Sequence, residues 1–485
     1  MADLLTGYRT LAGPDEMFAP DGEYRFAYRE FAERFRRWDA DEYRVRQSAS
    51  DLEQLNGGVT FTVYQDQAGT ERIFPFSLIP RIITAEEWAV IEAGLVQRVT
   101  ALNRFLTDLY GEQRCIRDGV IPAELVESAP GFNPRMRGFV PPLGVWAHIA
   151  GIDLIRDREG IFRVLEDNLR TPSGVSYVLE NRRTMLNVVP DLFPAGSVAP
   201  VDEYADRLLE MLVAVRPAGV DADETRSVIL TPGSYNSAYF EHSFLARQMG
   251  IELVEGRDLL VHDQHVYLRA TTGLEPVHVI YRRVDDEFLD PLVFREDSAL
   301  GVVGLFEAYR AGNVTIVNAI GNGIVDDKVT CRFVPAAIRY FLGEEPILPN
   351  VDTFVGALPS DLEFMLANLG DLVMKPSNAS GGYGIVIGPQ ASAADLQAAR
   401  ERLRANPSGY IAQPLQEFST IPSFDGERLE ARRADLRPFV VTGASSWVLP
   451  GGLTRVASDS NSYIVNSSQG GGSKDTWVLR PSRGT

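Results

Sequence analysis

The sequence predicts a mixed fold, with an α/β unit inside a larger α+β architecture, and three observations lead to it. The chain has 485 residues, which at roughly 150 residues per domain corresponds to about three lobes. Amphipathic helical patterns alternate along it with short runs of β-branched residues. Hydrophobic residues make up 45% of the chain and charged residues 23%, so a large core can form.

The first 110 residues are expected to be mostly helical. Residues 22–56 carry an aromatic stripe among Arg and Glu, which is typical of a helix that packs through its aromatic face. A strand pair is predicted next, in VTFTVYQ and RIFPFSLIP. Residues 85–110 are then predicted to form a long amphipathic helix, opened by Thr84 and carrying two glutamates in its first turn.

The later elements alternate between strands and helices. Residues 145–185 contain a β-hairpin, and residues 227–262 have the order strand, turn, helix and strand of a small open α/β unit. Near residues 370–390 a strand, a glycine loop and a second strand follow one another. A helix at about 394–405 and strands in GYIAQPL, ARRADLRPFVV and SSWVLPGG come next, and the glycine-rich stretch after residue 466 is expected to be a loop.

Composition excludes several classes of protein. No apolar run approaches the roughly 18 residues of a membrane span, and the first residues lack the basic and apolar regions of a secretory signal. Cys115 and Cys331 are the only cysteines, which excludes a disulfide framework and fits a reducing compartment. We therefore expect a cytoplasmic protein without a membrane partner. The net charge of −19 argues against a nucleic-acid partner, so bound phosphates would need a few concentrated donors.

Lysine usage points to such donors. Of the 47 Lys and Arg residues, only Lys328, Lys375 and Lys474 are lysines. A lysine ammonium reaches a phosphate oxygen as a point charge, whereas arginine is a wide planar fork. All three lysines stand beside glycine-rich or small polar stretches. The alternative is a genome that favours arginine, with three lysines left on the surface by chance.

The hairpin GIDLIRDREGIFRVLEDN is a candidate magnesium site. With a two- or four-residue loop, Asp153 would lie opposite Val164, and side chains alternate between the two faces of a strand. Asp153, Glu166 and Asn168 would then share one face. Two carboxylates and an amide oxygen suit Mg²⁺, which binds hard oxygen ligands and leaves positions for water and substrate phosphates. The alternative is an ordinary solvated strand face.

The opposite face of this hairpin is predicted to pack on the core. It would carry Ile152, Leu154 and Leu165. Asp167 falls on the same face, so it should not be a ligand unless a β-bulge shifts the register.

The glycine loop after Lys375 is the second candidate for phosphate binding. Its glycines let backbone N–H groups turn toward an anion, and the β-branched residues after it predict a strand. A P-loop or a dinucleotide-binding loop requires a helix at that point, so both are disfavoured. A glycine-rich hairpin folded over a triphosphate, with lysine at its base, remains; a plain flexible loop is the alternative. The loop residues proposed to contact the nucleotide are Ser380, Gly381, Gly382, Tyr383 and Gly384.

Five segments in fixed order resemble a known family. LEDNLRTPSGVSY, NGIVDDK, VMKPSNASGGYG, DLRPFVV and NSSQGGGSKDTW look like the circularly permuted ATP-grasp proteins of type 2, and more distantly like the synthetase domain of glutathionylspermidine synthetase. The resemblance covers roughly residues 75–480. In ordinary ATP-grasp enzymes the lysine and glycine loop precede the magnesium ligands, whereas here Glu166 comes about 200 residues before Lys375. A circular permutation explains this order.

The resemblance implies a permuted ATP-grasp fold that holds ATP between two lobes. It implies that Lys375 and Lys328 contact the nucleotide and that Asp153, Glu166 and Asn168 hold Mg²⁺. The segment from Gln413 to Leu415 is similar to the hinge that reads the adenine, although Pro414 stands where many relatives carry an acidic residue.

The implied activity is an ATP-dependent, ADP-forming carboxylate–amine ligase that acts through an acylphosphate. Its substrates would be a small-molecule carboxylate and an amine, such as an amino acid or short peptide. The residues expected to orient or close over the substrates are Arg170, Arg282, Arg437 and Lys474. A phosphotransferase and a non-catalytic ATP-binding protein are the alternatives.

The expected organisation has four parts. An N-terminal, mainly helical segment (1–72) precedes the part that carries the magnesium ligands (73–200). A small α/β unit on the substrate side (201–300) follows, and the ATP-binding lobe with the glycine loop (301–485) comes last.

Overall fold

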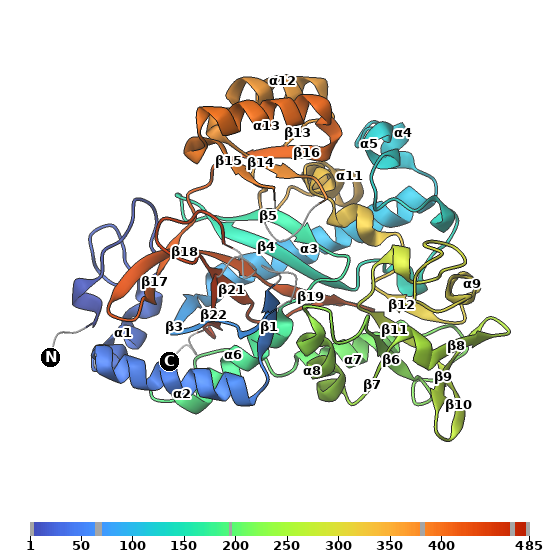
Figure 1. Ribbon diagram of the computed structural model, residues 1–485, viewed down its shortest axis with the longest axis horizontal. Coiled ribbons are helices and arrows are strands. Elements are labelled where there is room, and N and C mark those ends of the chain that lie inside the picture. Colours follow the sequence, from blue (N-terminus) through green and yellow to red (C-terminus); the bar gives the residue numbers. More distant parts are fainter. Residues whose placement is uncertain (1–3, 64–69, 194–195, 379–383, 466–470, 482–485) are drawn as a thin grey trace.

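The computed structural model describes residues 4–63, 70–193, 196–378, 384–465 and 471–481. A large mixed sheet occupies the middle of the molecule, a small lobe stands above it, an α/β unit lies at the lower right and the N-terminal segment at the left (Figure 1). Among the described residues, no helix combines the length and the apolar character needed to cross a membrane.

The central sheet has nine strands in the order β20-β19-β4-β18-β21-β22-β3, with β17 paired to β18 and β5 to β4. Its strands are β3 (Phe76–Ile83), β4 (Ile149–Arg156), β5 (Phe162–Asn168), β17 (Thr420–Phe424), β18 (Leu429–Arg437), β19 (Phe439–Thr442), β20 (Ser446–Val448), β21 (Leu453–Val456) and β22 (Gly472–Val478). The pairs are antiparallel except β22 with β3, which is parallel. Strands from both halves of the chain thus build one sheet.

Helix α3 (Ala85–Tyr110) confirms the prediction of a long helix at this position. Thr84 accepts a hydrogen bond from the amide of Glu87, and the Glu87 carboxylate accepts one from the amide of Thr84. This reciprocal cap satisfies two N–H groups that the first turn leaves unpaired. The helix packs against β19, β20 and helix α11 (Val334–Leu342), and most of its apolar side chains are buried in the main core.

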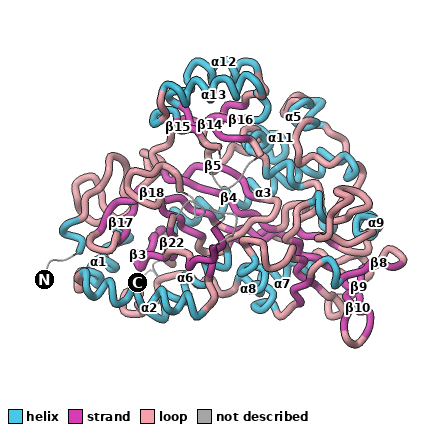
Figure 2. The backbone as a smooth tube through the Cα atoms, viewed as in Figure 1, coloured by secondary structure: helices cyan, strands magenta, loops and turns pink. Residues whose placement is uncertain are grey.

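The small lobe is a four-stranded antiparallel sheet in the order β13-β16-β14-β15, with helices α12 and α13 above it (Figure 2). Its elements are β13 (Phe354–Val355), α12 (Pro359–Asn368), β14 (Leu372–Pro376), β15 (Val386–Ile387), α13 (Ala393–Ala405) and β16 (Tyr410–Pro414). Strand β14 pairs with β15 on the two sides of the glycine loop, as predicted from the β-branched residues that follow that loop.

The α/β unit is built on a four-stranded parallel sheet in the order β12-β11-β6-β7. Its elements are α7 (Tyr204–Ala214), β6 (Ser227–Leu230), α8 (Tyr239–Met249), β7 (Glu252–Val254), β11 (Val279–Arg282), α9 (Leu305–Arg310) and β12 (Thr315–Val317). An antiparallel sheet projects from it, formed by β8 (Leu259–His262), β9 (His265–Ala270) and β10 (Gly273–Val277). The predicted order of strand, turn, helix and strand is confirmed by β6, α8 and β7.

The N-terminal segment differs from the single helix predicted there. It contains α1 (Arg29–Phe35) and α2 (Ala40–Asn56), separated at Asp39, whose carboxylate caps α2. Strands β1 (Thr60–Val63) and β2 (Thr70–Ile73) form the predicted pair, but the rest of the second run enters the central sheet as β3. The remaining helices are α4 (Arg114–Arg117), α5 (Ala123–Glu127), α6 (Val175–Val188) and α10 (Lys328–Cys331).

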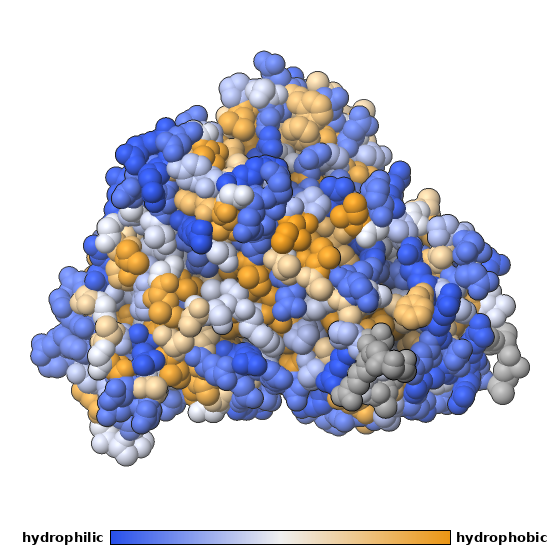
Figure 3. Space-filling view, turned by 180° about the vertical axis from the view of Figure 1, so that it is seen from behind, coloured by the Kyte–Doolittle hydropathy of each residue, from blue (hydrophilic) through white to orange (hydrophobic). Residues whose placement is uncertain are grey.

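Hydrophilic and apolar residues are distributed differently between the surface and the interior. On the face seen in Figure 3, hydrophilic side chains predominate and apolar side chains occur in small groups between them. The large apolar residues lie mainly inside. Two cores each combine residues of the central sheet with residues of the α/β unit, and further cores lie in the N-terminal segment and in the small lobe.

Candidate active site

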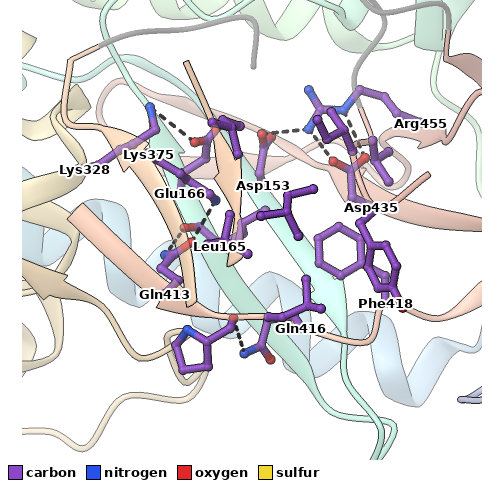
Figure 4. A pocket seen from close by; sticks show the side chains of 18 of the residues that line it. Asp153, Leu165, Glu166, Lys328, Lys375, Gln413, Gln416, Phe418, Asp435 and Arg455 are labelled. Atoms are coloured by element: carbon purple, nitrogen blue, oxygen red, sulfur yellow. Dashed lines mark hydrogen bonds and ion pairs between the residues drawn. The ribbon is translucent and has the colours of Figure 1, made fainter. Parts of the chain in front are cut away.

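A cleft lies between the small lobe and the central sheet. It contains about 950 Å³ of empty space, a volume that includes its open mouth. The residues that line it are Asp153, Leu165, Glu166, Lys328, Val373, Lys375, Pro376, Ile385, Ile387, Gln413, Pro414, Leu415, Gln416, Phe418, Asp435, Arg455, Tyr463, Ile464 and Val465 (Figure 4). The acidic hairpin and the lysines beside the glycine loop, from distant parts of the sequence, therefore face one cavity.

Lys375 extends from β14 toward the middle of the cleft. Its Nζ donates a hydrogen bond of 2.8 Å to Oε1 of Gln413 on the neighbouring strand β16. The Gln413 amide nitrogen in turn donates to Oγ1 of Thr353 at 3.0 Å. Burial lowers the pKa of Lys375, and the charge of Glu166 opposes that shift. Gln413 thus holds the ammonium group in place and leaves its other protons directed at the cavity.

Lys328 meets Glu166 at the same wall. Its Nζ lies 3.4 Å from Oε2 of Glu166. Lys328 is the first residue of α10, which Asp327 caps by accepting a hydrogen bond from Val329 N at 2.8 Å. The backbone N–H of Lys328 also donates to the carbonyl of Ser377, two residues after Lys375. One short helix therefore places this cation beside the base of the glycine loop.

The two strands of the acidic hairpin pair in a different register from the predicted one. Its loop spans residues 157–161, so Arg156 pairs with Phe162 and Leu154 with Val164. The prediction that Asp153 faces Val164 is therefore wrong. A β-bulge at Leu165 shifts the register by one, which puts Asp153 opposite Glu166 and Ile152 opposite Asp167.

The bulge explains which side chains enter the cleft. Asp153 and Glu166 share the cleft face, as expected. Leu165 also lines the cleft, which corrects its placement on the core face. Asp167 points away, and its two oxygens each accept a 2.6 Å hydrogen bond from the buried Arg98.

Asp153 is already held by two guanidinium groups. Arg437 donates to both of its oxygens, at 2.5 and 2.8 Å, and Arg455 donates to Oδ2 at 2.7 Å. Burial opposes ionisation of Asp153, but the two arginines outweigh it and hold its pKa well below the usual range. Asp435 completes the group by binding Arg455 through both oxygens, at 3.0 and 2.5 Å. Four charges thus form one end of the cleft: two buried carboxylates and two partly exposed guanidinium groups.

The oxygen donors fit a magnesium ion. Glu166 is partly exposed to the cleft, and Asp153 stands opposite it on the next strand. The side-chain nitrogen of Asn168 is buried without a hydrogen-bond partner among the described residues. Turning this amide around would put its oxygen in that place, which suits a cation. No group of three or more His, Cys, Asp or Glu side chains in the described ranges could hold a metal unaided, so amide and substrate oxygens would have to contribute.

The remainder of the cleft is mostly apolar. Val373, Ile385 and Ile387 come from the small lobe, whereas Leu415 and Phe418 belong to the connection between β16 and β17. Tyr463, Ile464 and Val465 add a third wall. Tyr463 is fixed from outside by the guanidinium of Arg433, which lies 3.6 Å from its ring centroid. Such an apolar slot beside cationic groups has the composition of a site for a flat base joined to phosphates.

Comparison with known proteins agrees with this arrangement. The family model described as circularly permuted ATP-grasp type 2 matches residues 80–457. The chain belongs to that family. A protein of Mycobacterium tuberculosis (strain H37Rv) is 54% identical to this ATP-grasp chain over 468 residues, which are 96% of the chain and 84% of the relative. A protein of Synechocystis is 50% identical over 469 residues, 96% of the chain and 97% of the relative.

Two further similarities are to a putative ligase and to a solved structure. A putative glutamate–cysteine ligase 2-3 of Frankia alni is 43% identical over 97% of this ATP-grasp chain, which spans 54% of that protein. The structure of a glutathione synthetase-like effector from Globodera pallida superposes with a TM-score of 0.59 at 12% identity, covering 91% of this chain and 98% of the effector. That structural likeness confirms the predicted permuted ATP-grasp fold.

Several residues expected at the site of this ATP-grasp protein lie elsewhere. Lys474 was expected in a loop, but it lies in β22, fully buried, with its Nζ bound to Ser77 Oγ, Ile79 O and Pro422 O. Arg282 is also fully buried and binds backbone carbonyls together with Asp286 at 2.6 Å. Neither lines the cleft.

Arg170 lies outside the cleft lining, and most of the glycine loop lies outside the described residues. Arg170 is 39% exposed and lies 3.5 and 3.6 Å from Asp285 and Asp326, outside the cleft lining. Gly384 ends the glycine loop with a φ of +74°. Residues 380–383, proposed to contact the nucleotide, lie outside the described ranges.

Asp435 and Arg455 are the charged residues of the cleft lining that the sequence did not reveal. Asp435 stands two positions before Arg437 on β18, and directly opposite Arg455 on β21. Alternation along the strand could have placed Asp435 on the face of Arg437. Arg455 has no comparable local signal, because only the pairing of β18 with β21 brings it there.

Proposed function

We propose that this protein is an ATP-dependent carboxylate–amine ligase that forms an amide bond and releases ADP and phosphate. The observation that carries the proposal is the meeting of Glu166 with Lys328 and Lys375 in one cleft, beside an apolar slot. Membership of the ATP-grasp family supports ATP as the phosphoryl donor. The names of the Frankia relative and of the Globodera effector support a ligase that joins amino acids.

The residues have distinct proposed roles in the first step. A carboxylate oxygen of the first substrate forms a bond to the γ-phosphorus, the bond from that phosphorus to the bridging oxygen of ADP breaks, and an acylphosphate results. Lys375 and Lys328 neutralise the phosphoryl oxygens, which is the main requirement of phosphoryl transfer. Glu166 and Asn168, with Asp153, would hold Mg²⁺, which when bound neutralises the triphosphate charge. Leu415 and Phe418 would pack against the base.

In the second step a neutral amine attacks the acyl carbon. The C–N bond forms, the bond from that carbon to the phosphate oxygen breaks, orthophosphate leaves and the amine nitrogen gives up a proton. Arg437 and Arg455, which bind Asp153 at one end of the cleft, carry guanidinium groups that suit an anionic substrate. We assign these two arginines to orient the carboxylate of the first substrate.

The test is ADP release from Mg²⁺ and ATP with pairs drawn from a panel of amino acids, short peptides and amines, with glutamate and cysteine among them. Products are identified by mass spectrometry. An amide product supports the proposal. A stable phosphorylated product would indicate a phosphotransferase, and ATP binding without turnover across the whole panel would indicate a non-catalytic nucleotide-binding protein. The Lys375→Met variant is the control for contaminating ATPases.

A further inference from the structure

The N-terminal segment reaches the wall of the cleft through Glu16. Asp15 forms a parallel bridge with Thr420 at the start of β17, where Glu16 N donates to Thr420 O at 2.8 Å and Thr420 N to Pro14 O at 2.9 Å. The Glu16 side chain is 3% exposed. It accepts a hydrogen bond of 2.5 Å from Ser419 Oγ.

Glu16 also binds two buried arginines of the central sheet. Arg81 of β3 donates to its Oε1, and Arg156 Nε lies 3.2 Å from the same oxygen. Burial raises the pKa of Glu16, but the two guanidinium groups outweigh it and lower the pKa to about 2. The carboxylate is therefore charged at any pH at which the protein would be assayed.

Two of the three side-chain partners of Glu16, Ser419 and Arg156, stand next to parts of the cleft. Ser419 directly follows Phe418, which lines the cavity. Arg156 ends β4, three residues after Asp153, and its carbonyl accepts a hydrogen bond from Ser419 N at 3.1 Å. The Glu16 carboxylate thus contacts both the strand that carries Asp153 and the residue after Leu415–Phe418, the segment proposed to pack against the base and called the base wall below.

The segment from Leu415 to Ser419 connects the small lobe to the central sheet. Strand β16 belongs to the first and β17 to the second, so the position of this connection depends on how its two ends are fixed. One end continues from the β16 ladder, and the other is fixed at Ser419 and Thr420 by the N-terminal segment. A wall held by two anchors is displaced when one of them is removed, and small displacements weaken binding strongly.

We propose that Glu16 is a positioning residue for nucleotide binding, which holds the base wall at Leu415 to Phe418 in place from outside the cleft. The inference rests on the proposed function only in that a nucleotide occupies the cleft. It assigns a role to the N-terminal segment, which lies outside the part of the chain that the family model matches. The specific consequence is that Glu16 affects recognition of the base and leaves recognition of the phosphates unchanged.

The experiment compares the binding of ADP with that of tripolyphosphate, which has no base, by calorimetry on the full chain with Mg²⁺. Glu16→Gln removes the charge. Ser419→Ala removes the hydroxyl that donates to Glu16 and accepts a 3.4 Å hydrogen bond from Arg81, and it leaves Arg81 paired with Glu16. We expect ADP affinity to fall about five- to tenfold in both variants, while tripolyphosphate affinity changes less than about twofold. Ser419→Ala decides the outcome if Glu16→Gln does not fold.

Asp475→Asn is the matched control, because it breaks a buried ion pair with Arg182 (2.7 Å) away from the cleft. It should leave the ratio of the two affinities unchanged. An unchanged ratio in Glu16→Gln and Ser419→Ala, or an equal loss of both ligands, would overturn the inference. If the unmodified protein binds neither ligand, the proposed function itself fails.

Discussion

Glu166 and Lys328 form an ion pair across the wall of the cleft, with 3.4 Å between Oε2 and Nζ. The two residues are far apart in the sequence and lie on β5 and α10. Their side chains are 25% and 17% exposed, so both are accessible to a ligand. An anion in the cleft would be attracted by Lys328 and repelled by Glu166. A cation would be attracted by Glu166 and repelled by Lys328. The pair therefore fixes where charges of each sign can be placed.

Neighbouring carboxylates on β5 should respond differently to loss of charge. Glu166→Gln is expected to raise the Mg²⁺ concentration that half-saturates ATP turnover by about tenfold, with little change in the free energy of unfolding, because Glu166 is partly exposed. Asp167→Asn leaves Arg98 buried without a full counter-charge and should destabilise the protein by about 3–5 kcal/mol.

Urea unfolding and Mg²⁺ titrations on the same two variants check this. The metal dependence of Asp167→Asn should stay close to that of the unmodified protein at temperatures where the variant is folded. A larger effect of Asp167→Asn than of Glu166→Gln on the Mg²⁺ requirement would contradict the observed strand register as the basis of the site.

Lys375 should be needed for chemistry and dispensable for folding. Lys375→Met keeps the aliphatic length but loses the ammonium that Gln413 orients, so we expect ATP-dependent phosphate release to fall by about 10²- to 10³-fold. The melting temperature should change little, because burial disfavours the charged form of Lys375 and lowers its pKa. Retained turnover would remove Lys375 from the proposed mechanism.

The sequence was most informative where short-range chemistry decides the structure. Helix α3 was predicted with its first and last residues, and Thr84 with the two glutamates after it marked its start. Asp153 and Glu166 lie on the cleft face of the hairpin as predicted, although the loop length and the placement of Leu165 were wrong. The bulge at Leu165 restored the alternation that the five-residue loop had reversed.

Contacts between elements that are distant in the sequence decided where Lys474, Arg282 and Arg455 lie. The stretch around Lys474 has the composition of a loop, but it becomes a central strand because β3 and β21 hold it on both sides. Arg282 has the residue type of a substrate clamp, but the α/β sheet buries it completely. Arg455 enters the cleft only through the pairing of two strands, and no local pattern encodes that contact.

Removing one guanidinium group from Asp153 should strengthen metal binding. Arg437 occupies both oxygens of this carboxylate, so a cation must compete with it. We expect Arg437→Met to lower the dissociation constant of Mn²⁺ about three- to tenfold in the absence of nucleotide, because a nearby positive charge is lost. Electron paramagnetic resonance of free Mn²⁺ measures this directly. Arg432→Met, on the same strand but paired with Glu430, is the control. Unchanged Mn²⁺ affinity in Arg437→Met would indicate that Asp153 is not a metal ligand.

The buried Lys474 should make the free energy of unfolding depend on pH. Burial lowers its pKa well below the usual value, and the charge of Arg432 adds to the shift. Between that lowered pKa and about 10.4, the value of an exposed lysine, the unfolded chain binds a proton that the folded chain does not. Stability from this site therefore rises with pH in that window and is constant below it.

The comparison of the unmodified protein with Lys474→Met isolates this contribution, because all other groups are common to both. The difference in free energy of unfolding, measured in urea between pH 7 and 10, should shift in favour of the unmodified protein as pH rises, by at most about 1.4 kcal/mol per pH unit. The gain comes from the neutral amine, which can donate to Ile79 O and Pro422 O and accept a hydrogen bond from Ser77 Oγ without the cost of a buried charge. Parallel curves for the two proteins over the whole range would mean that Lys474 stays protonated inside the fold.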